Sequence, residues 1–355
     1  MKKIFLTIIL IISLLSLSGC NYVELNDMGI VTLMAIKYEN NNYEITLELR
    51  ENIKDNDNAS TIHKGKGSSI EKALQELELG VDKHLYFIDL NVILIDENTI
   101  NEKLTSIIDY LTRDVSFGTK YNIVVDNNPD NTIKMIKSKN KIVGEYIKNI
   151  FNNKNNNVIN SKFDETLKSY LNEYKDLILP LGQIDKEEYT INKAVIFNNQ
   201  KIVSELSLDE IVIFNLINNI ASEYYFKINY LDKTLVYRVS THKVKTYYKD
   251  YKINIDVKLN GTFIEIEDIN LMDENTLNEV LNLLNLKIKK DFESLIMHLQ
   301  KDESDILAFK KAYYNSERTK INTIKNLDYQ INEDINLNRE GLIFNSIGDT
   351  YEKTR

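Results

Sequence analysis

The only cysteine of the 355-residue chain, Cys20, lies three residues after the end of a largely apolar run. This run, Ile4–Leu17, contains no charged residue and is preceded by Lys2 and Lys3. Fourteen helical residues would rise about 21 Å, which is shorter than the roughly 30 Å hydrocarbon core of a bilayer. A positive start followed by an apolar segment of this length is typical of a secretory signal peptide rather than of a permanent span. The sequence therefore predicts a signal peptide over residues 1–19.

The residues at the predicted cleavage site, Leu17-Ser18-Gly19-Cys20, resemble a bacterial lipobox. In a lipobox the cysteine thiol receives a diacylglyceryl group and becomes the first residue of the mature protein. Two acyl chains would attach the chain stably to a membrane, with residues 20–28 as the tether. The alternatives are an ordinary secretory signal with a chance cysteine and a stop-transfer helix. A lipidated Cys20 leaves no thiol for disulfides, thiolate metal sites or a cysteine nucleophile.

The composition of the mature chain, residues 20–355, excludes several kinds of partner. Loss of Lys2 and Lys3 with the signal peptide changes the net charge from −9 to −11. A negative net charge argues against nucleic acid as a binding partner. It also argues against adhesion to anionic lipid through charge alone. The length allows about two domains of 150 residues, and a hydrophobic content of 43% is that of a globular protein.

The first half of the mature chain predicts a mixed α/β domain over residues 29–185. A polar turn joins strands Gly29–Ile36 and Tyr43–Arg50, and the second strand alternates apolar residues with Glu44, Thr46 and Glu48, which predicts one solvent-facing side. Strand-like and helix-like segments then alternate, as in α/β folds. The expected segments are a polar loop at 52–67, a helix from Ser68 to Leu77 with Ser68 and Glu71 as a capping box, strands at 90–95 and 121–125, and helices at 102–111, 130–137, 144–151 and 162–174.

The second half predicts a strand-rich α+β domain over residues 186–345, followed by a polar tail at 346–355. The boundary is placed just after Leu179-Pro180-Leu181-Gly182, which contains one of the two prolines. Apolar residues recur at spacings of three and four through Met272–Lys301, which predicts a long helix packed on the strands. The other expected segments are strands at 192–197, 201–205, 234–248, 252–267 and 335–338 and a helix at 207–218.

The sequence carries no recognised arrangement of catalytic or metal-binding residues. Gly65-Lys66-Gly67 lacks the Gly-Lys-Ser/Thr ending of a phosphate loop. Asp302, Glu303 and Asp305 cluster after the long helix, but helix ends and solvated turns explain such clusters in a chain with 53 acidic residues. We therefore predict a protein that is not an enzyme and that uses no cofactor or metal ion. The histidines, which lack metal-ligand spacing, are His63, His84, His242 and His298.

Several short segments follow one another in order along the mature chain. The first is Glu24–Val31, directly behind the lipobox cysteine. The further segments are Gly65-Lys66-Gly67, Leu85-Tyr86-Phe87, Tyr110–Asp114, Gly144-Glu145-Tyr146, Ala194–Phe197, Ile288–Asp291, Ser304–Ala308 and the strand before Gly341. In this order and spacing they resemble the C subunits of spore germinant receptors, the GerC-type lipoproteins. The sequence departs from the family pattern at Asn21-Tyr22, where Trp-Asp is usual, and at Lys310-Lys311, where the family tends to have glycine.

The resemblance implies a non-enzymatic subunit that is lipid-anchored on the outer leaflet of the spore's inner membrane, with its body extracytoplasmic. It further implies partners in nutrient sensing, a polytopic A subunit and a transporter-like B subunit. For Arg113 and Asp114 a local ion pair is the alternative role, and for Asp305 a core or capping role. The candidate interface residues are Glu24, Asn26, Asp27, Arg113, Asp114 and Asp305.

Two other functions remain alternatives to a receptor subunit. A solute-binding lipoprotein that delivers a small ligand to a transporter would have two similar α/β lobes around a cleft, whereas the second half here is rich in hairpins. A surface hydrolase is disfavoured by the missing nucleophile and metal motifs.

Overall fold

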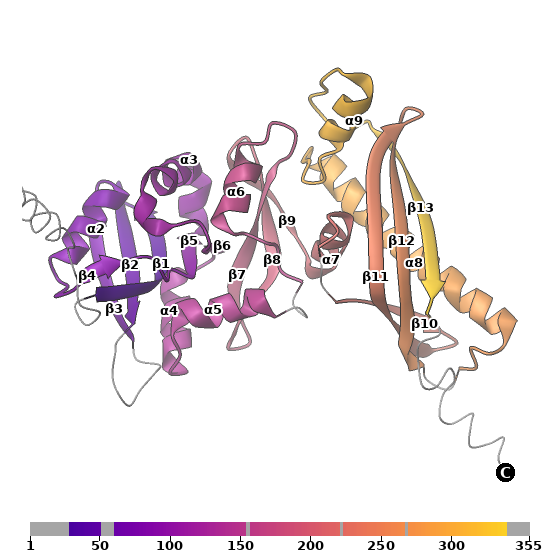
Figure 1. Ribbon diagram of the computed structural model, residues 1–355, viewed down its shortest axis with the longest axis horizontal. Helices are drawn as coiled ribbons and strands as arrows, with labels where there is room; N and C mark the ends of the chain where they lie inside the picture. Colours follow the sequence, from indigo (N-terminus) through magenta and orange to yellow (C-terminus); the bar gives the residue numbers. More distant parts are fainter. Residues whose placement is uncertain (1–27, 51–59, 154–156, 221–222, 267–268, 339–355) are drawn as a thin grey trace, which may run out of the picture.

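Two β-sheets lie along the length of the molecule, which a computed structural model describes over residues 28–50, 60–153, 157–220, 223–266 and 269–338 (Figure 1). The first sheet has the strand order β3-β2-β1-β5-β6-β7-β8-β9, with β4 paired to the start of β1. Strands β1, β5, β6 and β7 are parallel, and the remaining neighbours along that order are antiparallel. The strands are β1 (Met28–Glu39), β2 (Asn42–Arg50), β3 (Ser60–Gly67), β4 (His84–Tyr86), β5 (Val92–Asp96), β6 (Asn122–Asp126), β7 (Leu177–Asp185), β8 (Glu188–Asn198) and β9 (Lys201–Leu206).

Helices cover both faces of this first sheet, which confirms the mixed α/β prediction. Helices α2, α3 and α6 pack on one face, and α4 and α5 pack on the other (Figure 1). Their bounds are α2 (Ile70–Glu78), α3 (Glu97–Arg113), the short 3-10 helix η2 (Val115–Phe117), α4 (Pro129–Ser138), α5 (Val143–Asn152) and α6 (Phe163–Tyr170).

The predicted solvent-facing side of β2 is wrong. Thr46 and Glu48 are buried, because the face that they occupy is covered by the α4 and α5 layer. Alternation of polar and apolar residues normally marks a half-exposed strand. In β2 the alternation instead marks a polar contact inside the protein.

The predicted polar loop at 52–67 is wrong over its last eight residues, which form edge strand β3. Its two glycines allow α2 to lie directly against the strand. A Cβ atom at Gly65 would come 2.2 Å from the Ala73 carbonyl oxygen, and one at Gly67 would come 2.4 Å from the Ala73 nitrogen. Gly65-Lys66-Gly67 is thus a helix-packing feature. The N-cap of α2 is Ser69, one residue later than the predicted Ser68, and the helix begins at Ile70.

The second sheet has the order β10-β11-β12-β13 and confirms the predicted α+β region with a long packing helix. Strand β13 runs parallel to β12, whereas the other pairs are antiparallel. Strand β10 and helix α9 were not predicted, and β13 is longer than expected. The elements are α7 (Leu208–Ile217), β10 (Tyr224–Tyr230), β11 (Lys233–Lys249), β12 (Lys252–Ile266), α8 (Glu274–Lys301), α9 (Phe309–Glu317) and β13 (Asp328–Leu337).

The first sheet continues beyond the predicted division at residues 185/186. Residues 179–182, which were expected to interrupt the chain, lie inside β7, and β8 and β9 add to the same sheet. The strands β7 and β8 face two different cores. Leu179 and Val195 belong to the core of the first sheet, whereas Ile178 and Ile196 belong to the core of the second.

We call the first sheet with helices α2 to α6 the first unit, and the second sheet with helices α7 to α9 the second unit. The buried carboxylate of Glu48 joins three segments of the first unit. It accepts hydrogen bonds from the backbone N–H groups of Val143 and Gly144 at 2.8 and 2.9 Å, at the start of α5. It also accepts the hydroxyls of Thr32 and Ser60, both at 2.7 Å. A carboxylate at this position satisfies the unpaired N–H groups of the helix and complements the positive end of its dipole.

We expect Glu48→Gln to lower the free energy of unfolding by about 2–4 kcal/mol, because the amide leaves at least one buried donor unpaired. Urea unfolding of the full chain, followed by circular dichroism, measures the change. Glu39→Gln is the control, since the Glu39 side chain is 65% exposed in a surface ion pair, and should change stability by less than about 0.5 kcal/mol. Equal effects of the two substitutions would contradict the role assigned to Glu48.

Candidate functional sites

The predicted membrane anchor and the first predicted interface residues precede the described part of the chain. This group comprises the lipobox Leu17, Ser18, Gly19 and Cys20, and the interface candidates Glu24, Asn26 and Asp27. The described structure starts at Met28, the first residue of β1. No helix within the described residues combines the length and apolar character needed to cross a bilayer.

Arg113 and Asp114 lie on the surface at the end of α3. The Arg113 guanidinium donates through Nε to both oxygens of Asp109, at 2.9 Å. Exposed pairs of this kind contribute little to stability. The Asp114 carboxylate accepts the backbone N–H of Ser116 at 3.0 Å and the hydroxyl of Tyr110 at 3.3 Å, and so holds the turn that leads into η2. Arg113 is therefore accessible to a partner, while Asp114 has a local structural role.

Asp305 is fully buried and holds two distant parts of the chain together. Its carboxylate accepts the backbone N–H groups of Phe309 at 2.9 Å and Lys310 at 2.7 Å, at the start of α9. Its own backbone pairs with Asp176, just before β7: the Asp305 N–H donates to the Asp176 carboxylate at 2.6 Å, and the Asp176 N–H donates to the Asp305 carbonyl at 2.9 Å. We therefore do not retain Asp305 as an interface residue, because its carboxylate is enclosed within its own chain.

Two buried carboxyl groups have raised pKa values. Burial raises the pKa of Asp305 to about 6, and it also raises the pKa of Asp126, at the end of β6, to about 6. The Asp126 carboxylate accepts the Asn128 N–H at 2.8 Å and the Thr132 hydroxyl at 3.1 Å. These hydrogen bonds favour the ionised form but do not offset the loss of hydration.

When the pKa of a carboxyl group is higher in the folded protein than in the unfolded protein, the folded protein binds more protons at pH values between the two pKa values. Stability contributed by Asp305 is therefore present at low pH and is lost as pH rises through about 6. We expect the free energy of unfolding of the wild type to gain roughly 1 kcal/mol from this group between pH 7 and pH 5, and Asp305→Asn to lack that gain. Urea unfolding gives the free energy of unfolding of both proteins as a function of pH. The difference between the two profiles is the contribution of Asp305, because the other titrating groups are common to both proteins. Parallel profiles would contradict the raised pKa.

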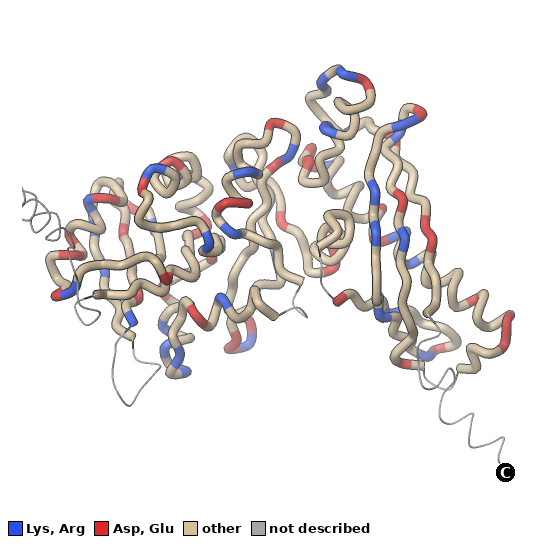
Figure 2. Tube along the Cα trace, viewed as in Figure 1, with Lys and Arg blue, Asp and Glu red and all other residues tan. Residues whose placement is uncertain are grey.

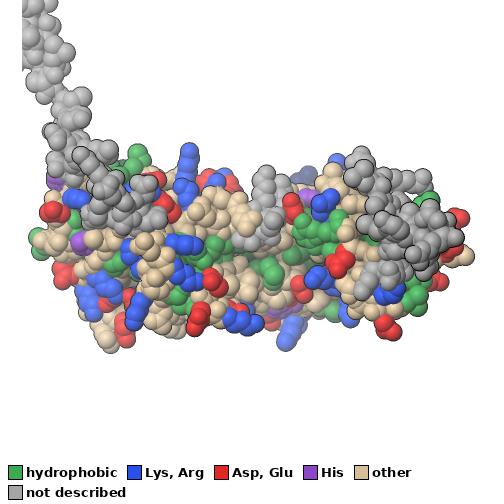
Figure 3. All heavy atoms as spheres, turned by 90° about the horizontal axis from the view of Figure 1, so that it is seen from below, with side chains coloured by type: hydrophobic (Ala, Val, Ile, Leu, Met, Phe, Trp, Pro, Cys, Tyr) green, Lys and Arg blue, Asp and Glu red, His purple; other side chains and the backbone are tan. Residues whose placement is uncertain are grey.

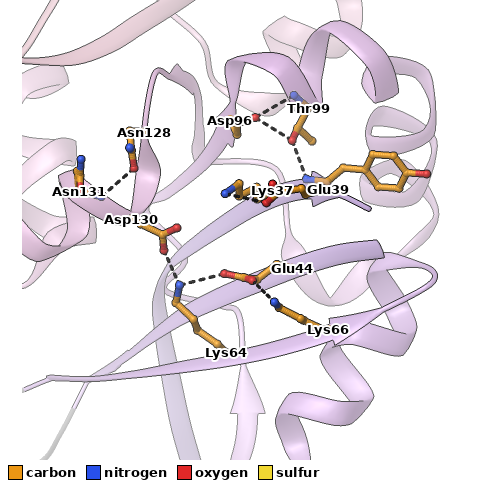
Figure 4. Close-up of polar contacts among 11 residues, drawn as sticks. Lys37, Glu39, Glu44, Lys64, Lys66, Asp96, Thr99, Asn128, Asp130 and Asn131 are labelled. Carbon is orange, nitrogen blue, oxygen red and sulfur yellow. Dashed lines mark hydrogen bonds and ion pairs between the residues drawn. The ribbon is translucent and has the colours of Figure 1, made fainter. Parts of the chain in front are cut away.

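Charged side chains gather at the carboxyl ends of the parallel strands, where open α/β sheets commonly bind ligands (Figure 4). Lys64 of β3 lies between Glu44, at 3.0 Å, and Asp130 of α4, at 2.5 Å. The Asp96 carboxylate accepts the N–H and hydroxyl of Thr99, both at 3.0 Å, and so caps α3. These groups are occupied by ion pairs and caps that connect the strands to α3 and α4.

A serine, a histidine and a glutamate meet between the two units in an arrangement that resembles a catalytic triad. The Ser204 hydroxyl of β9 is 2.6 Å from His298 Nε2, and the Glu210 carboxylate of α7 is 2.5 Å from His298 Nδ1. The sequence pattern missed this cluster, because its members are 94 and 88 residues apart. The same Nε2 also lies 3.1 Å from Asp302, and a carboxylate can be hydrogen-bonded there only by an N–H.

A general base must instead offer a lone pair to the serine hydroxyl. The Asp302 carboxylate competes for His298 Nε2, the nitrogen that would have to take the serine proton. The cluster is therefore better suited to holding β9 and α7 against α8. Among the residues that the structure describes, no group of three or more His, Cys, Asp and Glu side chains is placed to hold a metal ion.

A cleft of about 770 Å³ opens where the two units meet. Its lining includes Tyr146 of α5, Ile191 of β8, Val212 of α7 and the ion pair of Lys287 and Asp291 on α8. Hydrophobic side chains are visible around this middle part of the molecule in Figure 3. The volume lies within the range of small-molecule sites. The second unit is a four-stranded sheet with a long helix, so the two similar α/β lobes expected of a solute-binding protein are not present in the described chain.

Comparison with known proteins places both units in one family. Residues 21–184 match the family model of the spore germination protein N-terminal domain. Residues 191–341 match the model described as spore germination B3/GerAC like, C-terminal. These limits fall at the turn between β7 and β8, although the hydrogen-bonded sheet continues to Leu206.

Two individual relatives agree with the family match. Spore germination protein KC of Bacillus subtilis (strain 168) is 27% identical over 159 residues, which cover 40% of this chain and 38% of that protein. The match therefore spans well under two thirds of the relative's length. The crystal structure of the GerBC protein has the same fold, with a TM-score of 0.58 at 14% identity over 86% of this chain and 96% of that chain. The chain belongs to the GerC-type family of spore germinant receptor subunits.

Proposed function

We propose that this protein is the lipid-anchored, non-catalytic C subunit of a membrane nutrient germinant receptor, required for receptor assembly and signalling in spore germination. The observation that carries the proposal is the match of two successive spore germination family models across residues 21–341. Acidic and basic residues are interspersed along both units (Figure 2), so the described surface shows no extended basic stripe of the kind that nucleic acid binding requires.

The proposed location is the outer leaflet of the spore's inner membrane, with the body outside the cytoplasm. The lipobox-like residues before Cys20 support this location, because they suit cleavage and thioether formation at the cysteine. The proposed partners are the polytopic A subunit and the transporter-like B subunit. A short tether would hold the body near them at an effective concentration in the millimolar range, so weak contacts suffice for assembly. Glu24, Asn26, Asp27 and Arg113 remain candidate interface residues.

The absence of catalysis is part of the proposal. Its support is the geometry of Ser204 and His298, where Asp302 competes for the base nitrogen. The proposed limits of the regions remain 1–19 for the signal peptide, 20–28 for the tether, 29–185 and 186–345 for the two domains, and 346–355 for the tail.

We expect Cys20→Ala to move the protein from the membrane fraction to the soluble fraction of spores and to abolish nutrient germination, because alanine cannot form the thioether. Fractionation with immunoblotting and a germination assay measure both effects. Ser18→Ala is the matched control, since it keeps a small side chain before the cleavage site and should remain membrane-bound. Membrane retention together with normal germination of Cys20→Ala would rule out the anchor.

A pull-down from detergent-solubilised spore membranes tests the receptor assignment. We expect recovery of the A and B subunits with the tagged C subunit, because the assignment requires a complex. Recovery of neither subunit under conditions that preserve an A–B complex would overturn the proposal.

A solute-binding lipoprotein is the second candidate, and the 770 Å³ cleft is the observation that favours it. Calorimetric titration of the purified chain with germinant amino acids and sugars distinguishes the two functions. Saturable binding that is lost in Val212→Trp, which would fill the cleft, would favour the solute-binding function.

A further inference from the structure

Two large apolar side chains project into solvent at one end of the first sheet. Ile88 is 86% exposed and Val115 is 94% exposed. Single exposed apolar residues are common on proteins. These two differ because they belong to adjacent turns that the core holds in place.

The aromatic residues next to them fix both turns. Phe87 and Phe117 are buried, and their rings pack at an interplanar angle of 53° with the centroids 4.5 Å apart. On one side, β4 pairs with the first three residues of β1, with Tyr86 opposite Ile30. On the other side, Asp114 caps η2 through the Ser116 N–H. Ile88 follows Phe87 directly and Val115 opens η2, so the protein holds both side chains outward on a supported base.

This end of the sheet is also the end at which the chain arrives from the anchor. Met28, the first residue of β1, is paired with His84 of β4. Eight residue steps separate Cys20 from Met28, and a fully extended chain spans at most about 3.6 Å per residue. The start of β1 therefore stays within about 29 Å of the lipidated residue, and the turn that carries Ile88 follows β4, the strand paired to the start of β1.

The charges around the turns suit a headgroup region. Arg113 and Lys120 are exposed on either side of η2, and Arg113 pairs with Asp109. The exposed Asp82 precedes β4, and the half-buried Asp89 follows Ile88. Because both signs are present, charge alone would not hold this end on a membrane, and the apolar side chains must supply the attraction.

We propose that Ile88 and Val115 insert into the headgroup–acyl boundary of the bilayer and form a second, non-covalent membrane contact that orients the body. This inference rests on the proposed function, since it requires the lipid at Cys20. Burial of two aliphatic side chains is too weak for attachment by itself, but beside an anchor the contact becomes intramolecular. The acyl chains would hold the protein on the membrane, and the two side chains would set which face it presents.

The test uses the full-length lipidated protein in vesicles of phosphatidylglycerol and phosphatidylethanolamine. Lipidation consumes the only native thiol, so Ile88→Cys and Val115→Cys each provide a single site for an environment-sensitive fluorophore. Leu231→Cys is the control, because Leu231 is 75% exposed in the turn between β10 and β11 of the other unit. We expect quenching by spin-labelled lipid to be about threefold stronger at positions 88 and 115 than at 231, since interfacial apolar residues lie roughly 5–10 Å deep. The difference should persist at high salt.

Each outcome has one meaning. If positions 88 and 115 behave like 231 while mass spectrometry shows a diacylglyceryl group on Cys20, the membrane contact is wrong and the anchor stands. If lipid quenching at these positions is absent and they become shielded only when A and B subunits are reconstituted with the protein, the surface contacts protein and the proposal is overturned. If the fluorophore labels Cys20 of the wild type, the anchor itself fails, and the membrane contact fails with it.

Discussion

Successive residues of β7 and β8 point into two different hydrophobic cores, and this constraint determines how the two halves of the molecule are joined. Along β8, Ala194 and Ile196 belong to the core that contains α7, α8 and the second sheet, whereas Val195 and Phe197 belong to the core of the first sheet and α3. A strand buried on both faces cannot slip by one residue without exchanging the two sets of side chains. The two units therefore share β7 and β8 as a layer that is buried on both faces.

Buried carboxylates complete this joint. Asp305 caps α9 in the second unit while its backbone pairs with Asp176 at the entrance to β7, and His298 fastens β9 and α7 to α8. Inside the first unit, Glu48 ties β2 to α5. A buried carboxylate is costly unless its oxygens are hydrogen-bonded, so each of these groups specifies one arrangement of the segments around it. The motif Ser304–Ala308, which supported the family resemblance, is thus a structural element.

Two units that share buried strands suit a subunit that works by contact. If the acyl chains hold the start of β1 at the membrane and the adjacent turns rest on the bilayer, then the orientation of the first sheet also fixes the orientation of the second, through β7 and β8. The cleft between the units would then keep a defined position above the membrane. In such a protein the surface presented to partner subunits follows from the packing of the core.

The sequence by itself determined the long helix at 274–301, most of the strands, the mixed α/β and α+β classes, and the family, because these depend on periodicity and on residues in a fixed order. Only the tertiary structure decided what Glu48, Gly65, Asp305 and Ser204 do. Their partners across the fold lie from 8 residues away (Gly65 and Ala73) to 129 residues away (Asp305 and Asp176), and a local pattern carries no information about such contacts. The same limit explains why Leu179–Gly182 suggested a boundary. Its proline and glycine are ordinary signs of a turn, but pairing with β6 on one side and β8 on the other keeps this segment in the sheet.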